Sequence, residues 1–481
     1  MTPTVVLRDG LLGTVVPVPR DVAALSAIIG EQRYAALRHD AETFRRRFAG
    51  STIWNVNSTA AGGGVAEMLQ TLVGYVQDLG VDIRWLVLHG DPAFFATTKR
   101  LHNALHGDGD VGAPDAAEAE HYRAVLAENA AELTARVQPG DIVLLHDPQT
   151  AGLAPWLRRA GVPVVWRCHV GSDHRTATTR AAWAFLRQHL EGIDGFVFSR
   201  RRFVPPWMPA DRTWIIPPSI DPFAPKNSDL DPSTVDAVLR AAGLVDGPAP
   251  ATAPEFVGRD GQAAQVTRRA GVVGERLPGA SDELVLQVSR WDRLKDMSGV
   301  LDAFARHVAP ATEAMLALVG PAVTDVADDP EGAAVYQDCV RRWEALPADL
   351  RSRIVLVTLP LDDVDENAVM VNALQRHATA VVQKSLAEGF GLTVAEAMWK
   401  GRPVIGSAVG GITDQIVEGT GLLLPDPRDL VYFGGQVCRL LTDPALRDRL
   451  GAGAREHIRR NFVGDLHLRR YAELFSTVIG A

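Results

Sequence analysis

Two series of short apolar segments, each followed by a stretch long enough for a helix, constrain the fold of this chain more than any other feature. The first series comprises Ile53–Val56, Trp85–Leu88, Ile142–Leu145, Val162–Trp166 and Phe196–Phe198. The second comprises Leu284–Val288, Met315–Val319, Ile354–Val357, Ala380–Val382 and Pro403–Ile405. Short segments that are apolar on both faces are typical of parallel strands with helices on both sides of the sheet. The sequence therefore predicts an α/β fold with two doubly wound, Rossmann-like domains.

Changes in composition suggest where these domains begin and end. Residues 1–50 are predicted to form a helical preface, and residues 51–245 the first Rossmann-like domain. Residues 246–280 hold four prolines among six glycines, which predicts a mobile surface insertion or linker. Residues 281–464 form the second predicted domain. Apolar residues recur at helical spacing in 465–481, so we expect a C-terminal helix that packs back on the first domain.

Composition and charge exclude several classes of function. The formal net charge of -9 argues against a surface that coats nucleic acid. No apolar stretch approaches the ~20 residues of a membrane-spanning helix, and Met1–Gly10 lacks the pattern of a secretion signal. The three cysteines, Cys168, Cys339 and Cys438, are too dispersed for a disulfide framework or a zinc site. We therefore expect a cytoplasmic protein that binds small molecules, with neither nucleic acid nor membrane as a partner.

The segment Glu388–Glu396 joins a predicted strand to a predicted helix through a glycine-containing loop. The N–H groups and positive dipole at a helix start suit a diphosphate, and glycines let a ligand approach the backbone closely. Glu388 precedes the helix and Glu396 lies about one turn inside it, so the two carboxylates can bracket a ligand, one at sugar hydroxyls and the other at a ribose. Taken alone, the segment also fits a glutamate-capped helix after an ordinary loop.

A second segment, Gln287–Asp296, places Arg290 and Lys295 directly after a predicted strand. Ligands of open α/β sheets bind at the carboxyl edge of the strands, where these two cations would lie. There they can neutralise a leaving diphosphate, each contact contributing roughly 1.5–3 kcal/mol. One Arg and one Lys after a strand are more often surface charge, but together with Glu388–Glu396 they favour a diphosphate site.

The segment Asn57–Glu67 again reads as strand, glycine loop and helix. It resembles a dinucleotide-binding fingerprint superficially, but the third glycine is missing and no acidic residue ends a following strand at the expected place. We therefore reject hydride transfer. A loop that approaches phosphate or sugar from the opposite domain fits better.

Two further groups of polar residues follow strands of the first series. His146–Gln149 comes after Ile142–Leu145, and Arg167–His169 comes after Val162–Trp166. Both groups would lie at the carboxyl edge of the first sheet. A lone histidine is usually structural and Asp147 before Pro148 fits turn chemistry, so neither group identifies a site alone.

Taken together, these strings resemble a known family, the retaining trehalose synthases that use nucleotide-activated glucose. This family belongs to the GT-B group, which also contains the trehalose phosphorylases, sucrose synthases and glycogen synthases. The resemblance spans roughly Ile53 to Tyr471. The matching strings are Asn57–Thr59, Gly62–Glu67, His102–Leu105, His146–Gln149, Trp166–His169, Pro217–Pro222 and Glu388–Gly401.

The resemblance implies a GT-B architecture, in which two Rossmann-like domains face a central cleft, with the acceptor mostly on the first domain and the donor mostly on the second. It also implies a homodimer. The implied donor-binding residues are Gly63, Gly64, Arg290, Lys295, Glu388, Gly391, Leu392, Thr393 and Glu396. The implied acceptor-binding residues are Asn57, Asp147, Gln149, Arg167 and His169. The residues implied near the reacting centre are Arg290, Lys295, Glu388, His169 and Asp147.

Retaining transfer in this group is described as a front-face reaction, in which the acceptor hydroxyl attacks from the side that the diphosphate leaves and the diphosphate takes the proton. Such a reaction needs no protein nucleophile, and the sequence offers no compelling one. The resemblance implies trehalose formation from UDP-, ADP- or GDP-glucose and glucose. Three alternatives stay open: phosphorolysis of trehalose, another retaining GT-B transfer, and a non-catalytic module that binds sugar nucleotides.

No cofactor is expected to be required beyond the donor substrate. Asp108–Asp110 and Asp229–Asp231 match an Asp-x-Asp pattern that elsewhere holds a metal–diphosphate, but both lie in polar loops. We interpret them as solvated turns, because Arg290 and Lys295 already supply the charge that a metal would. No metal-binding residue is predicted, and the sequence leaves a magnesium requirement open.

Overall fold

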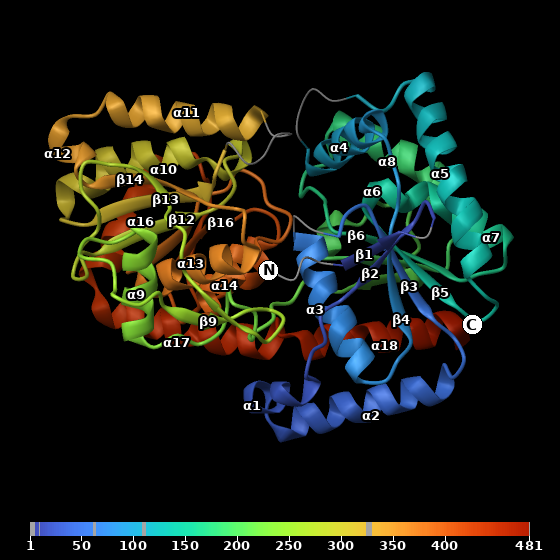
Figure 1. Cartoon of the computed structure of the whole chain (residues 1–481). Coiled ribbons are helices and arrows are strands. Elements are labelled where there is room, and N and C mark those ends of the chain that lie inside the picture. Colours follow the sequence, from blue (N-terminus) through green and yellow to red (C-terminus); the bar gives the residue numbers. More distant parts are fainter. Residues whose placement is uncertain (1–4, 9, 61–63, 108–111, 324–329, 481) are drawn as a thin grey trace. The chain divides into compact units, whose positions relative to one another are not determined.

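The computed structural model describes residues 5–8, 10–60, 64–107, 112–323 and 330–480. The chain divides into two compact units. The N-terminal unit runs to Ser219 and also takes in the chain from Phe462 onward, and the C-terminal unit comprises Ile220–Asn461. Each unit is built on a sheet of its own (Figure 1).

The sheet of the N-terminal unit has, within the described residues, eight strands in the order β1-β2-β4-β3-β5-β6-β7-β8. Strands β3 to β8 run parallel to one another. Strand β2 pairs with β4 in antiparallel orientation, and β1 pairs with β2 in antiparallel orientation. The bounds are β1 Val5–Arg8, β2 Gly13–Val16, β3 Ile53–Asn57, β4 Ile83–Val87, β5 Ile142–His146, β6 Val164–Cys168, β7 Gly195–Phe198 and β8 Thr213–Ile215.

Helices cover both faces of this sheet (Figure 1). Apolar residues of α4, α5, α7 and α8 fill the core on one face, and those of α2, α3 and α18 fill the core on the other. Helix α18 comes from the far end of the chain and packs on α2 and α3. The bounds are α1 Ser26–Ile29, α2 Glu31–Arg47, α3 Gly64–Asp78, α4 Pro92–His106, α5 Ala116–Arg136, α6 Asp147–Thr150, α7 Ala154–Arg159, α8 Ala177–Leu190 and α18 Gly464–Gly480.

The C-terminal unit has a second sheet, in which the described residues form seven strands in the order β11-β14-β13-β12-β15-β16-β17. Only the edge strand β11 is antiparallel to its neighbour. A separate hairpin joins β9 and β10. The bounds are β9 Glu255–Val257, β10 Ala263–Gln265, β11 Gly271–Val273, β12 Leu284–Val288, β13 Met315–Pro321, β14 Ile354–Leu359, β15 Ala380–Gln383, β16 Val404–Ser407 and β17 Leu422–Leu424.

Helices α10, α11, α16 and α17 pack on one face of the second sheet, and α9 packs against α13. With two parallel sheets wound by helices, the predicted α/β fold with two Rossmann-like domains is confirmed. The bounds are α9 Pro232–Ala242, α10 Met297–Ala303, α11 Pro330–Glu344, α12 Ala348–Arg351, α13 Val364–His377, α14 Leu392–Trp399, α15 Ile412–Gln415, α16 Leu430–Thr442 and α17 Pro444–Asn461.

The start of the chain differs from the wholly helical preface that the sequence predicted for residues 1–50. Helix α2 is present, but β1 and β2 come before it and join the first sheet, where β2 pairs with β4. The physical reason is local composition, because Val5, Val6, Val15 and Val16 are β-branched and favour a strand.

Residues 246–280 are also held more firmly than a mobile linker would be. Strand β11 belongs to the second sheet, and Phe256 of β9 is buried. The carboxylates of Asp365 and Glu366 on α13 form ion pairs with Arg259 and Arg268. Prolines and glycines shape the turns of this segment, while ion pairs and strand pairing fix it to the unit.

The boundary between the units also differs from the predicted one, since residues 220–245 belong to the C-terminal unit. Buried side chains hold this segment there. Asn372 of α13 donates to the carbonyl of Pro225 at 2.9 Å, and the indole of Trp399 on α14 donates to the carbonyl of Asn227 at 3.0 Å.

Candidate active site

The loop after β12 carries the two cations that the sequence predicts for a diphosphate, and two contacts fix its shape. The buried Trp291 donates from its indole Nε1 to the carbonyl of Pro321 at 3.0 Å, which anchors the loop to β13. Asp292 caps the 3-10 helix η5 (Arg293–Lys295) by accepting from the backbone N–H of Leu294 at 2.8 Å. These two contacts, made by adjacent residues, fix the part of the loop between Arg290 and Lys295.

The two predicted cations, Arg290 and Lys295, lie in different surroundings. The Arg290 side chain is 68% exposed and pairs with Asp292 at 3.1 Å. The Lys295 side chain is only 15% exposed, and its ammonium lies 2.6 Å from Oε2 of Glu388. The same oxygen accepts from the Ser385 hydroxyl at 3.1 Å. The structure thus brings Lys295 and Glu388 together and leaves Arg290 on the exposed part of the loop.

Buried contacts beneath this pair tie the loops after β12 and β15 together. The N–H of Leu386 donates to the carbonyl of Leu294 at 2.7 Å. The fully buried Lys384 pairs with Asp296, which has a positive φ of 49°. Gln287 of β12 accepts from the backbone N–H of Lys384 at 3.1 Å. The position of Lys295 relative to Glu388 is therefore set by the framework and not only by their own attraction.

The glycine turn before α14 is equally constrained. Gly391 has a φ of 84° and lies immediately before the helix. A Cβ atom at Gly410, whose φ is 50°, would lie 1.6 Å from the carbonyl oxygen of Glu388. The side-chain amide of the buried Gln415 donates to the carbonyls of Phe390 and Gly391. Two elements after β16 therefore hold the turn, and neither was identified from the sequence.

The start of α14 offers backbone donors next to this turn. The N–H groups in the first turn of a helix have no intrahelical partner and carry the positive end of its dipole. Leu392 and Thr393 are the first two residues of α14. The Thr393 hydroxyl donates to the side-chain carbonyl of Gln383 at 3.1 Å, which ties the helix start to the end of β15.

Glu396 lies further along α14 and is buried between basic groups. Its carboxylate lies 3.5 Å from the ammonium of Lys226. The buried Lys400 donates to the backbone carbonyl of Glu396 at 3.1 Å and to Oδ1 of Asn227 at 3.3 Å. Burial lowers the pKa of Lys400 to about 7, although the nearby Glu396 acts in the opposite direction. Glu396 therefore lies on α14, the helix that follows the glycine turn, and Lys226 from the segment before α9 balances its negative charge.

In the N-terminal unit, Asp147 lies where β5 ends. Its φ of 65° is unusual for a residue other than glycine, and it precedes Pro148. Its Oδ1 accepts from the backbone N–H of His169 at 2.7 Å. Burial raises the pKa of Asp147 to about 7, although this hydrogen bond and the charge of Arg167 both act to lower it. Near neutral pH the group therefore titrates between a neutral acid and a carboxylate.

This pKa predicts an unusual pH dependence of stability. The folded-state pKa lies above the ordinary value of 3.8, so the stabilisation is complete below about pH 4 and is lost as the pH rises through about 7. We expect Asp147→Asn to remove this dependence. The free energy of unfolding of the wild type should fall by roughly 2–3 kcal/mol more than that of the variant when the pH is raised from 5 to 8. Urea unfolding of both proteins at the two pH values measures the difference.

The control for this measurement is Asp211→Asn, which changes an exposed carboxylate of the same unit. It should keep a constant offset from the wild type at both pH values. A constant offset for Asp147→Asn as well would contradict the raised pKa.

Beside Asp147, the side chains of Arg167, His169, His146 and Asn55 form a directed chain of hydrogen bonds. Arg167 donates from Nε to Nδ1 of His169 at 3.2 Å, so the neutral His169 ring carries its proton on Nε2. That Nε2 lies 3.1 Å from Nδ1 of His146, whose Nε2 lies 3.1 Å from Oδ1 of Asn55. Burial lowers the pKa of His169 well below its ordinary value and that of His146 to about 3. Both rings are therefore neutral, and each donates to the next group along the chain.

Arg167 connects this chain to the C-terminal helix. Its side chain is fully buried, donates from Nη1 to the hydroxyl of Tyr471 at 2.5 Å, and donates from Nη2 to the carbonyl of Ile216 at 3.1 Å. The predicted role of Arg167 in contacting the acceptor is corrected here, because a fully buried guanidinium with these partners cannot reach a sugar. Arg167 instead orients His169.

The remaining predicted residues of the N-terminal unit differ in their accessibility. Asn57 is buried, accepts from the Trp85 indole at 2.7 Å and donates to the carbonyl of Thr59 at 2.7 Å, so its side chain shapes the loop. Its contact with the acceptor stays a prediction. Gln149 is half-buried. Gly64 is exposed at the start of α3, and Gly63 lies outside the described residues.

A cavity of about 250 Å³ lies at the carboxyl ends of β3 and β4. Ser58 and Thr59 line it from the loop after β3, and His89 and Gly90 line it from the loop after β4. The carboxyl edge of the first sheet thus offers a hollow beside the segment that leads to Gly64.

Of the two Asp-x-Asp segments, Asp108–Asp110 lies outside the described residues. Asp231 caps α9 by accepting from the backbone N–H groups of Ser233 and Thr234. The Asp229 carboxylate pairs with Arg376 at 3.0 Å. The described residues contain no cluster of three or more His, Cys, Asp or Glu side chains that could hold a metal ion. In the described part of the chain, no helix has the length and apolar character needed to cross a membrane.

Comparison with known proteins gives two family matches and near-full-length relatives. Residues 55–205 match a family described as trehalose synthase, N-terminal domain, and residues 361–457 match glycosyl transferases group 1. A trehalose synthase from Pyrococcus horikoshii is 33% identical over 96% of this chain and 97% of its own length. A trehalose synthase from Rubrobacter xylanophilus is 33% identical over 98% of this chain and 100% of its own length. A trehalose phosphorylase from Pleurotus pulmonarius is 28% identical over 84% of this chain and 54% of its own length.

Solved structures resemble the chain in fold. A UDP-forming α,α-trehalose-phosphate synthase from Burkholderia xenovorans has a TM-score of 0.66 and 17% identity, covering 89% of this chain and 99% of its own. Anabaena HepE in complex with UDP-glucose has a TM-score of 0.58 and 16% identity, covering 89% of this chain and 100% of its own.

Proposed function

The chain belongs to the trehalose synthase family and has the GT-B fold, and from this premise we propose how its residues share the transfer of glucose from a nucleoside diphosphate to a second glucose. It is a retaining hexosyltransferase that forms trehalose. The observation that supports the division of roles best is the contact of 2.6 Å between Lys295 and Glu388, next to the glycine turn that begins α14. A cation, a carboxylate and a helix start meet there, and a glucosyl diphosphate needs all three.

On the donor side, we assign the diphosphate to Arg290 and Lys295. Lys295 can contact a phosphate oxygen and Glu388 at the same time, because an ammonium has three donors. Glu388 then accepts from glucose hydroxyls while Lys295 compensates its charge. The N–H groups of Leu392 and Thr393, at the positive end of α14, complete the anion site.

Further residues belong to the donor in this proposal. Glu396 accepts from the ribose hydroxyls, and Lys226 balances its charge from 3.5 Å. Gly391 permits the close approach of sugar and backbone, and we assign Gly63 and Gly64 to the donor as well. HepE, which shares the fold, is known in complex with UDP-glucose, which supports a nucleotide sugar as the class of donor.

On the acceptor side, Asp147 is the group that we assign to the acceptor hydroxyl. Its Oδ1 is held by the backbone N–H of His169, which leaves Oδ2 for the sugar. Both ring nitrogens of His169 are engaged by Arg167 and His146, so His169 acts by fixing the position of Asp147. Gln149, half-buried two residues further on, supplies a neutral amide to the same sugar.

In the transfer, the acceptor oxygen forms a bond to C1 of the donor glucose while the bond from C1 to the diphosphate oxygen breaks. The proton of the acceptor hydroxyl passes to the departing diphosphate, which leaves on the same face. Arg290, Lys295 and the start of α14 stabilise the negative charge that grows on the leaving group, where one preorganised donor contributes ~3–4 kcal/mol. Asp147 orients the acceptor so that its oxygen lies near C1.

The chain from Tyr471 through Arg167 to His169 predicts a positioning effect from the C-terminal helix. We expect Tyr471→Phe to lower kcat by about tenfold with the KM for the donor unchanged, because a buried guanidinium loses a partner worth about 1.5 kcal/mol or more and its hold on His169 loosens. Steady-state kinetics with varied donor and varied acceptor separate these constants.

The matched control is Arg33→Gln, which breaks an ion pair of 2.7 Å between Arg33 of α2 and the buried Asp465 of the same C-terminal helix. It should lower the melting temperature and leave kcat near the wild-type value. Equal losses of kcat in both variants would show that looser packing of α18 causes the effect. That result would contradict a specific role for the Tyr471 hydroxyl.

The function is tested by identifying the product. The purified chain is incubated with glucose and UDP-, ADP- or GDP-glucose in turn, with EDTA or with Mg²⁺, and the mixture is followed by proton NMR. We expect α,α-trehalose and an equal amount of nucleoside diphosphate. A second incubation contains trehalose and inorganic phosphate. Release of glucose 1-phosphate and glucose there, with no product from any nucleotide sugar, would instead make the protein a phosphorylase. The similarity to the Pleurotus enzyme makes this the second candidate.

A further inference from the structure

A separate cavity of about 480 Å³ lies in the N-terminal unit, between α8 and the loop after β7. We call it the arginine pocket, after the six side chains that characterise it: Arg175, Arg180, Arg187, Arg202, Trp183 and Trp207. It shares no lining residue with the groups assigned above to donor or acceptor. Its volume is within the range of small-molecule sites.

The charge of the arginine pocket is uniformly positive. Four arginines and His174 line it, and none of the described residues that line it is acidic. Arg187 approaches Glu191 at 3.8 Å, but both side chains are more than half exposed, so this pair contributes little. A local cluster of this kind in a chain of net charge -9 creates a positive potential that attracts an anion.

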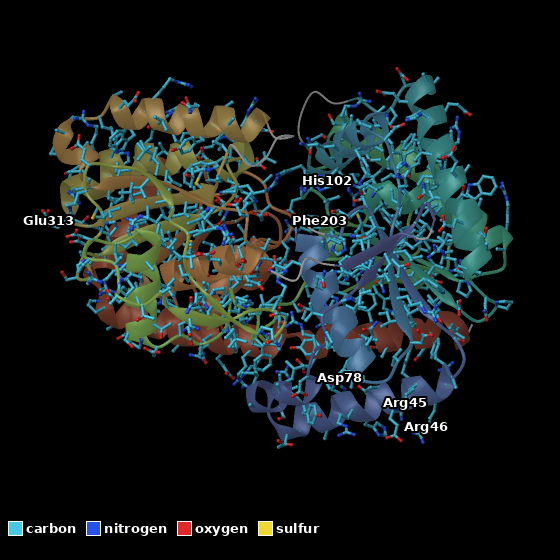
Figure 2. All side chains as sticks on the ribbon, in the orientation of Figure 1. Arg45, Arg46, Asp78, His102, Phe203 and Glu313 are labelled. Carbon is cyan, nitrogen blue, oxygen red and sulfur yellow. The ribbon has the colours of Figure 1, made fainter. Side chains whose placement is uncertain are left out.

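Contacts behind the lining residues fix the walls of the pocket. Asp173, in the loop after β6, pairs at 3.0 Å with the buried Arg200, in the loop after β7. Gly171 lies so close to Phe203 (labelled in Figure 2) that a Cβ atom would lie 2.3 Å from the ring. The pocket is therefore largely formed before any ligand binds, which lowers the cost of binding.

The floor of the pocket is aromatic and apolar. Trp183 packs edge-on against the buried Trp166, with ring centroids 6.1 Å apart. Arg187 lies over the Trp207 ring, with its guanidinium carbon 5.5 Å from the ring centroid. Both tryptophans are half-buried, so each has a stable ring and an accessible part. Such a floor suits the face of a ring in the ligand.

Helix α8 adds to the attraction for an anion. Thr176 caps the helix by accepting from the backbone N–H of Thr179, so the helix begins where Arg175 and Arg180 stand. The positive end of a 14-residue helix and two arginine side chains then act on the same space. Guanidinium groups bind phosphate through paired, parallel hydrogen bonds.

We propose that the arginine pocket binds a phosphate monoester carried on a ring, such as a hexose phosphate or a nucleoside monophosphate. Arg175 and Arg180 hold the phosphate at the start of α8. The ring lies toward Trp183 and Trp207. This is a second small-molecule site, distinct from the one where the transfer takes place.

Titration calorimetry of the full chain at low ionic strength tests the proposal, with glucose 6-phosphate, AMP and inorganic phosphate as probes. We expect saturable binding of at least one of the two esters, at least tenfold tighter than that of inorganic phosphate and weakened by added salt. In the double variant Arg175→Gln/Arg180→Gln this binding should fall by at least tenfold, while transfer from donor to glucose stays unchanged.

The matched control is Arg159→Gln, since Arg159 is also an exposed arginine over a tryptophan, Trp156, but lies outside the pocket. It should bind the ester like the wild type. Equal affinities for the ester and for inorganic phosphate would overturn the role of the aromatic floor, and no saturable binding of either ester would overturn the site. Binding that survives in the double variant but is lost in Asp147→Asn or Lys295→Ala would assign the ester to the transfer site, which also overturns the proposal without affecting the proposed function.

Discussion

Replacing Lys295 with alanine should lower kcat by about 100-fold or more, while the protein stays folded. The loss has two parts. The variant lacks a fixed cation for the departing diphosphate, and a preorganised donor of this kind contributes ~3–4 kcal/mol. It also leaves Glu388 without the ammonium that now lies 2.6 Å from its Oε2, so the carboxylate loses its orientation toward the donor glucose. Single-turnover kinetics with saturating donor measure the chemical step directly.

The neighbouring Arg293→Ala is the matched control, because Arg293 lies in the same 3-10 helix but its side chain is 79% exposed and forms a long ion pair of 3.6 Å with Glu331. It should keep near-wild-type activity. Activity of Lys295→Ala within threefold of the wild type, in a variant with an unchanged circular dichroism spectrum, would remove Lys295 from the donor site.

Replacing Gly410 with alanine should lower activity by ~100-fold, although Gly410 is not expected to touch either substrate. The added Cβ would lie 1.6 Å from the carbonyl oxygen of Glu388, so the loop that carries Glu388 must move by an ångström or more. Displacing a reacting group by about 1 Å costs on the order of 100-fold in rate. The positive φ of 50° adds roughly 1–2 kcal/mol of backbone strain. Activity and thermal unfolding of the purified variant measure the two effects.

Gly419→Ala separates strain from collision. Gly419 also has a positive φ, of 79°, but a Cβ atom there would meet nothing within 4 Å. Backbone strain should lower the stability of Gly419→Ala about as much as that of Gly410→Ala, but Gly419→Ala should keep its activity. If Gly410→Ala and Gly419→Ala lost activity equally, the close approach of Gly410 to Glu388 would not be the cause.

The central strands could be predicted from the sequence because burial on both faces produces an unbroken apolar run. Ile53–Val56 and Leu284–Val288 agree with β3 and β12 to within one residue at each end. Edge strands gave no such signal. β8 is only three residues long and half-buried, and β11 pairs on one side only, so neither needs a continuous apolar run.

Part of the candidate site could also be inferred, for a topological reason. The strands β12 and β15 are parallel neighbours, so the loops that follow them leave the sheet at the same edge and bring Lys295 near Glu388. The groups that hold this site were not predicted. Gln415 and Gly410 act across more than 20 residues of sequence, and no local pattern marks such contacts.

The role of Arg167 could not be inferred for a different reason. Its position after a strand predicted a group at the edge of the sheet, and a sequence does not reveal that the side chain turns inward. Its partner Tyr471 comes from the other end of the chain. Only the fold brings the two together.

The central claim is that Arg290 and Lys295 act on one diphosphate. Isothermal titration of the nucleoside diphosphate that the turnover assay identifies, into the wild type, Arg290→Ala, Lys295→Ala and the double variant, tests it most directly. We predict that each single variant binds about tenfold or more weakly, since each loses a charge-assisted contact of roughly 1.5–3 kcal/mol. Wild-type affinity in either folded single variant would show that the two cations do not share a ligand and would contradict the account.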